Sequence, residues 1–407
     1  MTEKLFYKDS HLREFEAKVL SCRPAESREL SGRKGCCAVE LSGTAFFPEG
    51  GGQYADTGML GGFRVVDVQE ADGHIFHYLE LPRDGRDGAG SPEVFRPGAS
   101  VTGTIDWEER FMKMQQHSGE HIVSGLVHAR FGYDNVGFHL GSTDCTMDFN
   151  GDITKEELRE IEREANRAVW KNLEIQTLYP DEQELAQMEY RSKIEIEGQV
   201  RIIVVPGYDV CACCAPHVSR TGEIGIIKLT HIQRYKGGVR VTMLCGERAL
   251  ADYGVKQEQA GEISAMLCAK ENEIAEAVRH LKEEAGSLKY ELGEKEKKLV
   301  LAKAGEIPRD GRAACIFTED FSGDSMRMLM NRVLEDGHVL CAVFHGNEQG
   351  GYRYVLGSRT MDIRNMAKEL NAAFGGRGGG KPEMVQGTLS GKEADIRTWL
   401  CEKAGGK

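Results

Sequence analysis

Apolar and polar residues alternate in short runs through the first 105 residues of the chain. These runs, separated by Gly, Pro and Asp-Gly turns, are Cys36–Phe47, Gly58–Val68, His74–Leu81 and Ser100–Trp107. Alternation of this kind is typical of strands that bury one face. We therefore expect residues 1–105 to form a small β-barrel-like domain or a curled sheet.

The pattern changes to a helical period near Asp106. The Asp106 carboxylate can cap the helix, and Glu109, three residues later, would complete a capping box. Apolar residues at helical spacing give this helix a buried side, formed by Phe111, Met114, Ile122 and Leu126.

Helix and strand patterns then alternate up to about residue 250. Residues 136–149 indicate paired strands, and 153–172 an amphipathic helix whose apolar stripe contains Leu158, Ile161, Ala165, Ala168 and Val169. Three further strands are predicted at Val200–Val205, Ile224–Ile232 and Val239–Leu244. We expect residues 106–250 to form an α+β domain.

Heptad spacing dominates residues 255–304. Two apolar rows, offset by four, contain Leu267, Ile274, Leu281 and Leu288, and Val278, Ala285, Leu292 and Leu299. A continuous helix of some 50 residues would be about 75 Å long, whereas Gly286-Ser287 or Gly293 could divide it into a hairpin. Residues 251–305 are thus expected to be a long helix or helical hairpin that serves as a spacer or as a homodimer surface.

Residues 306–407 return to an α/β rhythm. Strands are predicted at Ala313–Phe317, His338–Phe344 and Tyr352–Leu356, with helices at Ser325–Glu335, 362–374 and 392–404. Between the last two helices, Phe374-Gly-Gly-Arg-Gly-Gly-Gly-Lys-Pro382 is predicted to be a loop. Its backbone N–H groups, with Arg377 and Lys381, could bind phosphate. The Gly-Lys-Ser/Thr of a Walker loop is not present.

The distribution of charge indicates which part of the chain could bind nucleic acid. The net charge is −12, but residues 311–407 carry 13 Lys+Arg against 12 Asp+Glu, so any RNA contact is expected there. No apolar run approaches the length of a membrane span, and the first residues lack the apolar core of a signal peptide. The 12 cysteines are too sparse for a disulfide scaffold. We expect a cytoplasmic protein with no membrane contact.

Two half-sites of identical spacing suggest a metal site. His117 and His121 lie four residues apart in the predicted helix, and Cys213 and His217 repeat that spacing. Three nitrogens and one sulfur suit tetrahedral zinc. Cys211 and Cys214 are competing thiols, and unrelated core histidines beside structural cysteines remain the alternative. In His-Ser-Gly-Glu-His the glutamate does not follow the first histidine directly, which disfavours protease chemistry.

Three motifs in order resemble the editing domain of alanyl-tRNA synthetase and the free-standing AlaX proteins. They are Thr44 to Gln53, the HxxxH at 117–121 and the CxxxH at 213–217. The segments at 375–381 and 382–387 also look like the C-terminal tRNA-binding domain of the synthetase. The chain departs from the family at Cys214-Ala215-Pro216, where Gly-Gly-Thr is usual. The resemblance, in the arrangement of a long AlaX protein, covers nearly all of the chain.

The resemblance implies an ATP-independent aminoacyl-tRNA deacylase. It would hydrolyse alanine tRNA that carries a wrong amino acid, chiefly serine with glycine as the second candidate, with one zinc per chain held by His117, His121, Cys213 and His217. It further implies catalytic or substrate contacts at Thr44, Gln53 and His139, a family acidic position at Asp148, and tRNA contacts at Arg377 and Lys381. Because only about 105 residues precede the editing domain, we expect no tRNA charging.

Two other functions remain open from the sequence. A zinc hydrolase could act on free aminoacyl esters or amides, and it would then cleave a small serine ester about as well as charged tRNA. Alternatively, the zinc could be structural and the protein a non-catalytic RNA-binding module.

Overall fold

The computed structural model describes residues 1–25, 36–80, 93–192, 198–309, 312–321 and 323–405. The chain divides into two compact units, Met1–Gln259 and Ala260–Lys407. Helices and strands are mixed in both units, which confirms the α+β class. Both predicted domains before residue 250 fall in the first unit, and the boundary between them at residues 105 and 106 stays a prediction. In the described residues no helix is long and apolar enough to cross a membrane.

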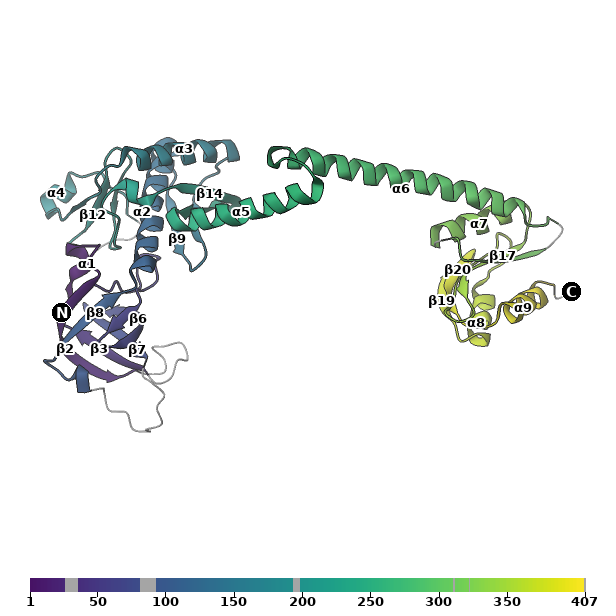
Figure 1. Cartoon of the computed structure of the whole chain (residues 1–407), viewed down its shortest axis with the longest axis horizontal. Helices are drawn as coiled ribbons and strands as arrows, with labels where there is room; N and C mark the ends of the chain where they lie inside the picture. Colours follow the sequence, from purple (N-terminus) through teal and green to yellow (C-terminus); the bar gives the residue numbers. More distant parts are fainter. Residues whose placement is uncertain (26–35, 81–92, 193–197, 310–311, 322, 406–407) are drawn as a thin grey trace. The chain divides into compact units, whose positions relative to one another are not determined.

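Six strands of the first unit close on themselves as a barrel (Figure 1). In order of pairing they are β2 (Glu14–Pro24), β3 (Cys36–Leu41), β7 (His74–Glu80), β6 (Phe63–Ala71), β5 (Gly58–Leu60) and β8 (Ser100–Ile105), and β8 pairs with β2. Alternate strand residues are buried in its core, among them Leu41, Leu60, Val65, Ile75 and Leu79, and Phe95 from the 3-10 turn Glu93–Phe95 packs with them. Leu81, the predicted end of one strand, lies outside the described residues. A short parallel pair, β1 (Glu3–Lys4) and β4 (Gly43–Thr44), and the helical turn α1 (Leu5–Lys8) complete this part.

Helix α2 (Trp107–Phe131) begins after Asp106, as the sequence predicts. The predicted capping box is wrong, because the Asp106 side chain makes no hydrogen bond to the helix N-terminus. Its carboxylate instead accepts hydrogen bonds from Thr57 and Arg64, and Glu109 accepts one from Thr57. Both acidic groups therefore join the start of α2 to the β5–β6 region of the barrel.

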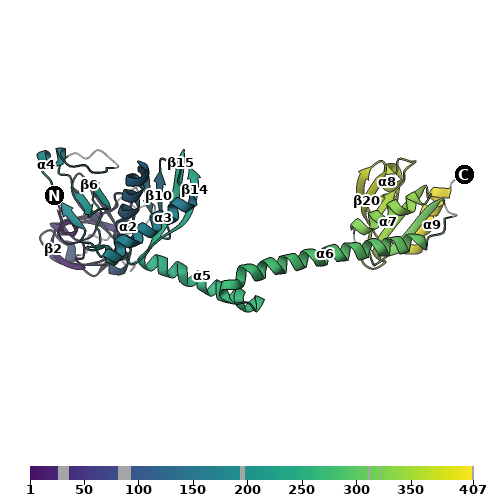
Figure 2. The same cartoon turned by 90° about the horizontal axis from the view of Figure 1, so that it is seen from above.

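A four-stranded antiparallel sheet packs beside α2. Its strand order is β14 (Ile227–Tyr235), β15 (Gly238–Cys245), β10 (Cys145–Phe149) and β9 (Asn135–Leu140), and helix α3 (Lys155–Lys171) packs against α2 and β14 (Figure 2). The predicted stripe of α3 is buried in full, at Leu158, Ile161, Ala165, Ala168 and Val169. A second sheet of β11 (Gln176–Leu178), β12 (Ile202–Val205) and β13 (Asp209–Ala212) leads into the cysteine cluster, and α4 (Glu182–Ala186) lies between β11 and β12 in sequence.

The heptad segment forms two helices, α5 (Gly246–Leu267) and α6 (Ile274–Gly305). The interruption lies at Cys268, which has a positive φ of 50°, whereas Gly286 and Gly293 lie within α6. Apolar positions of both heptad rows are exposed on α6, at Val278, Leu281, Leu288, Leu292 and Leu299. Association of two chains through this face stays a prediction, which the mass of the protein in solution would test.

The second unit contains a five-stranded sheet with helices α7 (Gly323–Glu335), α8 (Arg364–Ala373) and α9 (Glu393–Gly405). The strand order is β16 (Ala313–Thr318), β17 (Leu340–Asn347), β18 (Gly351–Gly357), β20 (Met384–Leu389) and β19 (Arg377–Lys381). The strands and helices predicted here are confirmed, but the prediction of a loop at the glycine-rich segment is wrong. Residues 377–381 form an edge strand because their backbone pairs with β20 from Arg377↔Thr388 to Lys381↔Met384.

His77 is a buried histidine in the barrel whose titration should affect stability. Its Nδ1 donates to the Val39 carbonyl at 3.0 Å, and its Nε2 accepts from Thr44 Oγ1 at 2.8 Å. Burial lowers the pKa of His77 from 6.5 to about 4. The unfolded chain therefore binds a proton at a higher pH than the folded chain, and the free energy of unfolding falls as the pH drops from 6.5 to 4.

Between pH 7 and pH 4.5, the free energy of unfolding of the wild-type protein should fall by about 2–3 kcal/mol more than that of His77→Gln, because the variant lacks the buried imidazole. Urea unfolding at the two pH values measures this difference. His231→Gln, which replaces an exposed histidine on β14, is the matched control. Equal pH dependence in His77→Gln and wild type would show that His77 does not titrate in this range.

Candidate metal centre

Two glycines allow α2 to approach its neighbours closely. A Cβ at Gly125 would lie 2.2 Å from the Tyr208 carbonyl oxygen, and a Cβ at Gly119 would lie 2.4 Å from Cys245 Sγ. Real side chains do not fit at such separations. The glycines therefore let the middle of α2 lie against the start of β13 on one side and the end of β15 on the other.

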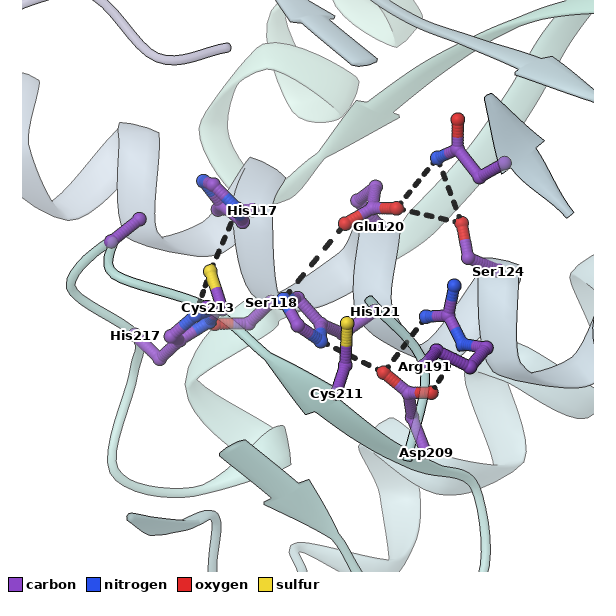
Figure 3. Close-up of polar contacts among 12 residues, drawn as sticks. His117, Ser118, Glu120, His121, Ser124, Arg191, Asp209, Cys211, Cys213 and His217 are labelled. Atoms are coloured by element: carbon purple, nitrogen blue, oxygen red, sulfur yellow. Dashed lines mark hydrogen bonds and ion pairs between the residues drawn. The ribbon is translucent and has the colours of Figure 1, made fainter. Parts of the chain in front are cut away.

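This packing brings both predicted half-sites together. His117, His121, Cys213 and His217 each offer one ligand atom, and these four atoms lie within 4.8 Å of one another. His117 and His121 come from α2, whereas Cys213 and His217 follow β13, and Figure 3 shows the side chains directed at one another. The three histidines are buried and Cys213 is half-buried.

Each of the three imidazoles is oriented by a contact at Nδ1. His117 Nδ1 lies 3.1 Å from Gln53 Oε1, His121 Nδ1 lies 2.8 Å from Asp209 Oδ2, and His217 Nδ1 lies 3.2 Å from Ser118 Oγ. The Nε2 atom of each ring is therefore the one available to a metal. Partners of this kind fix the tautomer and the ring direction of histidine ligands in metal sites.

The distances within the group fit a tetrahedral ion. Zinc bonds of about 2.3 Å to sulfur and about 2.0–2.1 Å to nitrogen place neighbouring donors roughly 3.5 Å apart at tetrahedral angles. Cys213 Sγ lies 3.5 Å from His117 Nε2 and 3.4 Å from His217 Nε2. The donor set and its spacing therefore suit zinc, and its occupancy stays a prediction.

The pKa values of the side chains in this group are shifted in different directions. Burial opposes ionisation of Cys213, but the neighbouring His117 and His217 hold the pKa of its thiol well below the usual value. Burial lowers the pKa of His217 from 6.5 to about 3. Burial also opposes protonation of His121, yet its hydrogen bond to Asp209 raises its pKa well above the ordinary value.

The loop that carries Gln53 lies against the metal-site group, which consists of His117, His121, Cys213 and His217. Gly51 and Gly52 have positive φ angles of 61° and 80°. A Cβ at Gly52 would also lie 2.4 Å from the Phe138 carbonyl oxygen. The glycines thus serve as the turn that the sequence suggests, and they let the loop reach β9 while Gln53 contacts His117. The Phe138 ring, 4.8 Å from the His117 ring, forms the apolar wall beside it.

Of the competing thiols, Cys211 lies nearer to the group than Cys214. His121, Asp209 and Cys211 form a second, overlapping set of donors, whereas Cys214 is exposed and belongs to neither set. Asp209 is already bound by Arg191 at 2.8 and 2.9 Å as well as by His121. We infer that Asp209 orients His121, and that Cys213 is the thiol toward which the imidazoles point.

The sequence reveals no role for Asp209, Arg191, Ser118 or Glu120. Asp209 stands just before the cysteine cluster, so its position was a usable signal, but nothing local links Arg191 to it. Glu120 is buried beside the group, where it accepts hydrogen bonds from Ser124 at 2.7 Å and from Asn135 at 2.6 Å. Its other oxygen lies 3.9 Å from His121 Nε2.

The other predicted site residues lie in different surroundings, and not all of them are near the metal-site group. Thr44 is wholly buried, and its hydroxyl donates to His77 and accepts from the Phe46 N–H. His139 is exposed on the face of β9 opposite to the buried Phe138, so it is not brought into the group. Asp148 forms a paired ion contact with Arg240. Arg377 and Lys381 belong to the second unit, on β19.

Known proteins resemble this chain over both units. Residues 200–242 match the model of the threonyl and alanyl tRNA synthetase second additional domain, and residues 310–400 match that of the DHHA1 domain. Alanyl-tRNA editing protein AlaX-L of Pyrococcus horikoshii is 26% identical over 99% of this chain and 98% of its own length. Over its whole length, the chain resembles the AlaX-type alanyl-tRNA editing proteins.

Further relatives agree with this assignment. Alanyl-tRNA editing protein Aarsd1 of Rattus norvegicus is 26% identical over 97% of this chain and 97% of its own length. The alanine--tRNA ligase of Pyrococcus abyssi is 28% identical over 95% of this chain, which spans 42% of that enzyme. The similarity to the AlaX-type proteins thus extends over nearly their full length, and that to the ligase over less than half of its length.

We expect the purified protein to contain one zinc per chain and Cys213→Ser to lose most of it, because a hydroxyl is a much poorer zinc ligand than a thiolate. Cys214→Ser, which changes the neighbouring exposed thiol, is the matched control and should keep its zinc. Elemental analysis of both variants gives the result. Equal zinc contents in the two variants would exclude Cys213 as a ligand.

Proposed function

We propose that the protein hydrolyses the ester between alanine tRNA and a wrongly attached amino acid, chiefly serine and also glycine. The observation that carries the proposal is the convergence of His117, His121, Cys213 and His217 on one point. Relatives that match the whole chain and bear the name alanyl-tRNA editing protein supply the reaction. In this hydrolysis water adds to the ester carbonyl carbon, the bond from that carbon to the ribose oxygen breaks, and the departing oxygen takes up a proton that the water gives up.

Zinc is the metal that we assign to these residues, where it would orient or polarise the aminoacyl group. The chain itself would supply the positioning. Gln53, Asp209 and Ser118 fix the three imidazoles, and the Phe138 ring limits the space beside His117. Positioning of this kind favours hydrolysis because the reacting groups are held before the reaction begins.

Gln53 has a second group that suits catalysis. Its Oε1 faces His117, while its Nε2 is buried and has no hydrogen-bond partner in the described part of the chain. Buried amide donors without a partner are uncommon. We assign Nε2 to the carbonyl oxygen of the substrate, where negative charge develops. Gln53→Glu keeps the acceptor for His117 and removes this donor, so a lower kcat at unchanged zinc content would support the assignment.

Selection of serine over alanine is assigned to Thr44. A pocket that bonds a serine hydroxyl leaves polar groups unpaired when alanine is bound, and such pockets discriminate by up to roughly 10⁴–10⁵-fold. The Thr44 hydroxyl already has His77 and Phe46 as partners, and an oxygen of this type has one more lone pair with which to accept the serine hydroxyl. His139 is retained as a contact for the terminal ribose.

The second unit is assigned to tRNA binding. Arg377, Gly379 and Lys381 share one face of β19, and a Cβ at Gly379 would meet nothing within 4 Å. The two cations are separated by four residues, roughly 13 Å along a strand. Open backbone between two exposed cations lets an RNA phosphate chain approach closely.

The assay that tests the function uses alanine tRNA charged with serine, glycine or alanine. We expect rapid deacylation of the serine ester, slower deacylation of the glycine ester and little action on the alanine ester. His121→Ala should abolish the activity, because it removes one donor of the metal-site group. A small serine ester cleaved as fast as charged tRNA would instead support a general esterase, and no deacylation at all would refute an editing function.

In the same assay Thr44→Val should narrow the ratio of Ser-tRNA to Ala-tRNA hydrolysis, because valine keeps the shape of threonine and removes its hydroxyl. The variant should also be less stable by about 1–3 kcal/mol, since His77 Nε2 loses its donor. Reduced stability with an unchanged ratio would assign Thr44 a structural role only.

Replacing both Arg377 and Lys381 by Gln should weaken tRNA binding and reduce the slope of log affinity against log salt by about 1–2. The matched control is replacement of Lys282 and Lys289, two exposed lysines of α6. Binding measured over a series of salt concentrations decides the assignment. An unchanged slope in the β19 variant would place the phosphate contacts elsewhere.

A further inference from the structure

A cleft of about 450 Å³ adjoins the metal-site group within the first unit. One wall is formed by residues 6–10, at the end of α1 and just beyond it, and another by Glu174, Ile175, Thr177 and Arg201. Residues 217–220 form the remaining side, so the cleft extends from the molecular surface to His217. Ser10 Oγ donates to the His217 carbonyl at 2.8 Å and joins the first wall to this side.

Arg201 is the most buried cation of the cleft, with 8% of its surface exposed. Its Nη1 donates to the carbonyl oxygens of Cys213 at 2.8 Å and Ala215 at 3.0 Å. Its guanidinium also lies over the Tyr7 ring, 5.0 Å from the ring centre. The Nε is buried and finds no hydrogen-bond acceptor among the residues that the structure describes.

Neither acidic residue of the cleft has a described contact with Arg201, and the two other cations there have partners of their own. Lys8 pairs with Glu3, and Arg220 donates to the Asn172 carbonyl at 2.6 Å. Asp9 accepts the His11 N–H at 2.8 Å, and Glu174 lines the cleft without a described contact to Arg201. A buried guanidinium whose described acceptors are neutral carbonyls is costly, because it loses its hydration without gaining a counter-ion.

We propose that this cleft binds the phosphodiester that precedes the terminal adenosine of tRNA, with Arg201 as its main contact. The inference rests on the proposed function, which places the aminoacyl ester at the metal-site group. The anion closest to that ester is the phosphate on the other side of the same ribose. Arg201 donates to the carbonyl of Cys213, so its guanidinium lies close to the metal-site group that would hold the ester. Guanidinium groups suit phosphate because their N–H groups match its oxygens in pairs.

A purely structural role is the alternative, since Arg201 also holds the carbonyls on either side of Cys214. The two roles differ in one measurable respect. Loss of a structural contact would weaken the binding of every ligand of the site to the same degree. Loss of a phosphate contact removes only the gain in affinity that the phosphate supplies.

The test therefore compares two uncleavable probes on the full-length protein. One is 3′-seryl-amido-3′-deoxyadenosine, and the other is the same compound with a 5′-phosphate methyl ester, which reproduces the phosphodiester. Calorimetry measures the affinity of both probes for wild type, Arg201→Gln and Arg201→Lys. Elemental analysis of each variant shows whether the metal-site group is intact.

We expect the phosphate to raise the affinity of the wild type by roughly tenfold to a hundredfold, as hydrogen bonds to charged groups do. Arg201→Gln should show no gain, and Arg201→Lys a partial one. Arg220→Gln, which changes an exposed cation of the same cleft, should keep most of the gain. A full gain in Arg201→Gln, or an equal loss in Arg220→Gln, overturns the proposal.

Failure of this inference is distinguishable from failure of the proposed function. Absence of deacylation of every charged tRNA by the wild type refutes the function. A wild type that deacylates Ser-tRNA but binds both probes equally, or binds neither, refutes the phosphate site alone.

Discussion

The candidate site depends on how closely helix α2 approaches the segment that carries Asp209 and Cys213. Any side chain at Gly125 would collide with the Tyr208 carbonyl, so the approach is open to glycine alone. At this separation His121 directs Nδ1 at Asp209 and leaves Nε2 facing Cys213. A shift of α2 by the width of one methyl group would break the hydrogen bond to Asp209 and move Nε2 away from Cys213. Hydrogen bonds and metal bonds tolerate changes in length of only a few tenths of an ångström.

A buried network of charges holds the neighbouring loop to the same helix. Arg110 and Lys113 of α2 are wholly buried with Asp56, and they also donate to the carbonyls of Ser10, Ala45 and Ala55. Removing one partner of a buried ion pair typically costs about 3–5 kcal/mol. The loop from residue 45 to 56, which carries Gln53, is therefore fixed to α2 just before His117. One helix thus sets the position of three parts of the site: its own histidines, the Gln53 loop and the Asp209 segment.

The sequence predicted those features that local spacing determines. Residues four apart on a helix share a face, so His117 and His121 were identifiable as a pair, and Cys213 and His217 repeated the interval. Many of the strands, and the buried stripe of α3, followed from apolar periodicity, whereas β2, β11, β13 and β20 were not predicted. Partners distant in the chain were not identifiable, because no local pattern connects Arg191 or Gln53 to a particular histidine. The direction of His139 depends on which face of β9 is buried, and the sheet determines that.

Local composition gave wrong predictions where tertiary contacts decide the conformation. Asp106 has the sequence of a helix cap, but Thr57 and Arg64 bind its carboxylate instead. The segment Gly375–Lys381 has the composition of a loop, yet pairing with β20 makes part of it a strand. Glycine disfavours strands through backbone entropy, a cost that ladder hydrogen bonds can offset.

The edge position of β19 has a consequence for the behaviour of the second unit in solution. β19 ends the strand order, so its outer backbone groups find no further strand among the described residues. Unpaired backbone groups of this kind can form hydrogen bonds with a strand of another polypeptide, and charged side chains on the edge strand disfavour such pairing. Arg377 and Lys381 stand at the two ends of β19. The charges assigned to RNA would thus also prevent the sheet from growing into aggregates.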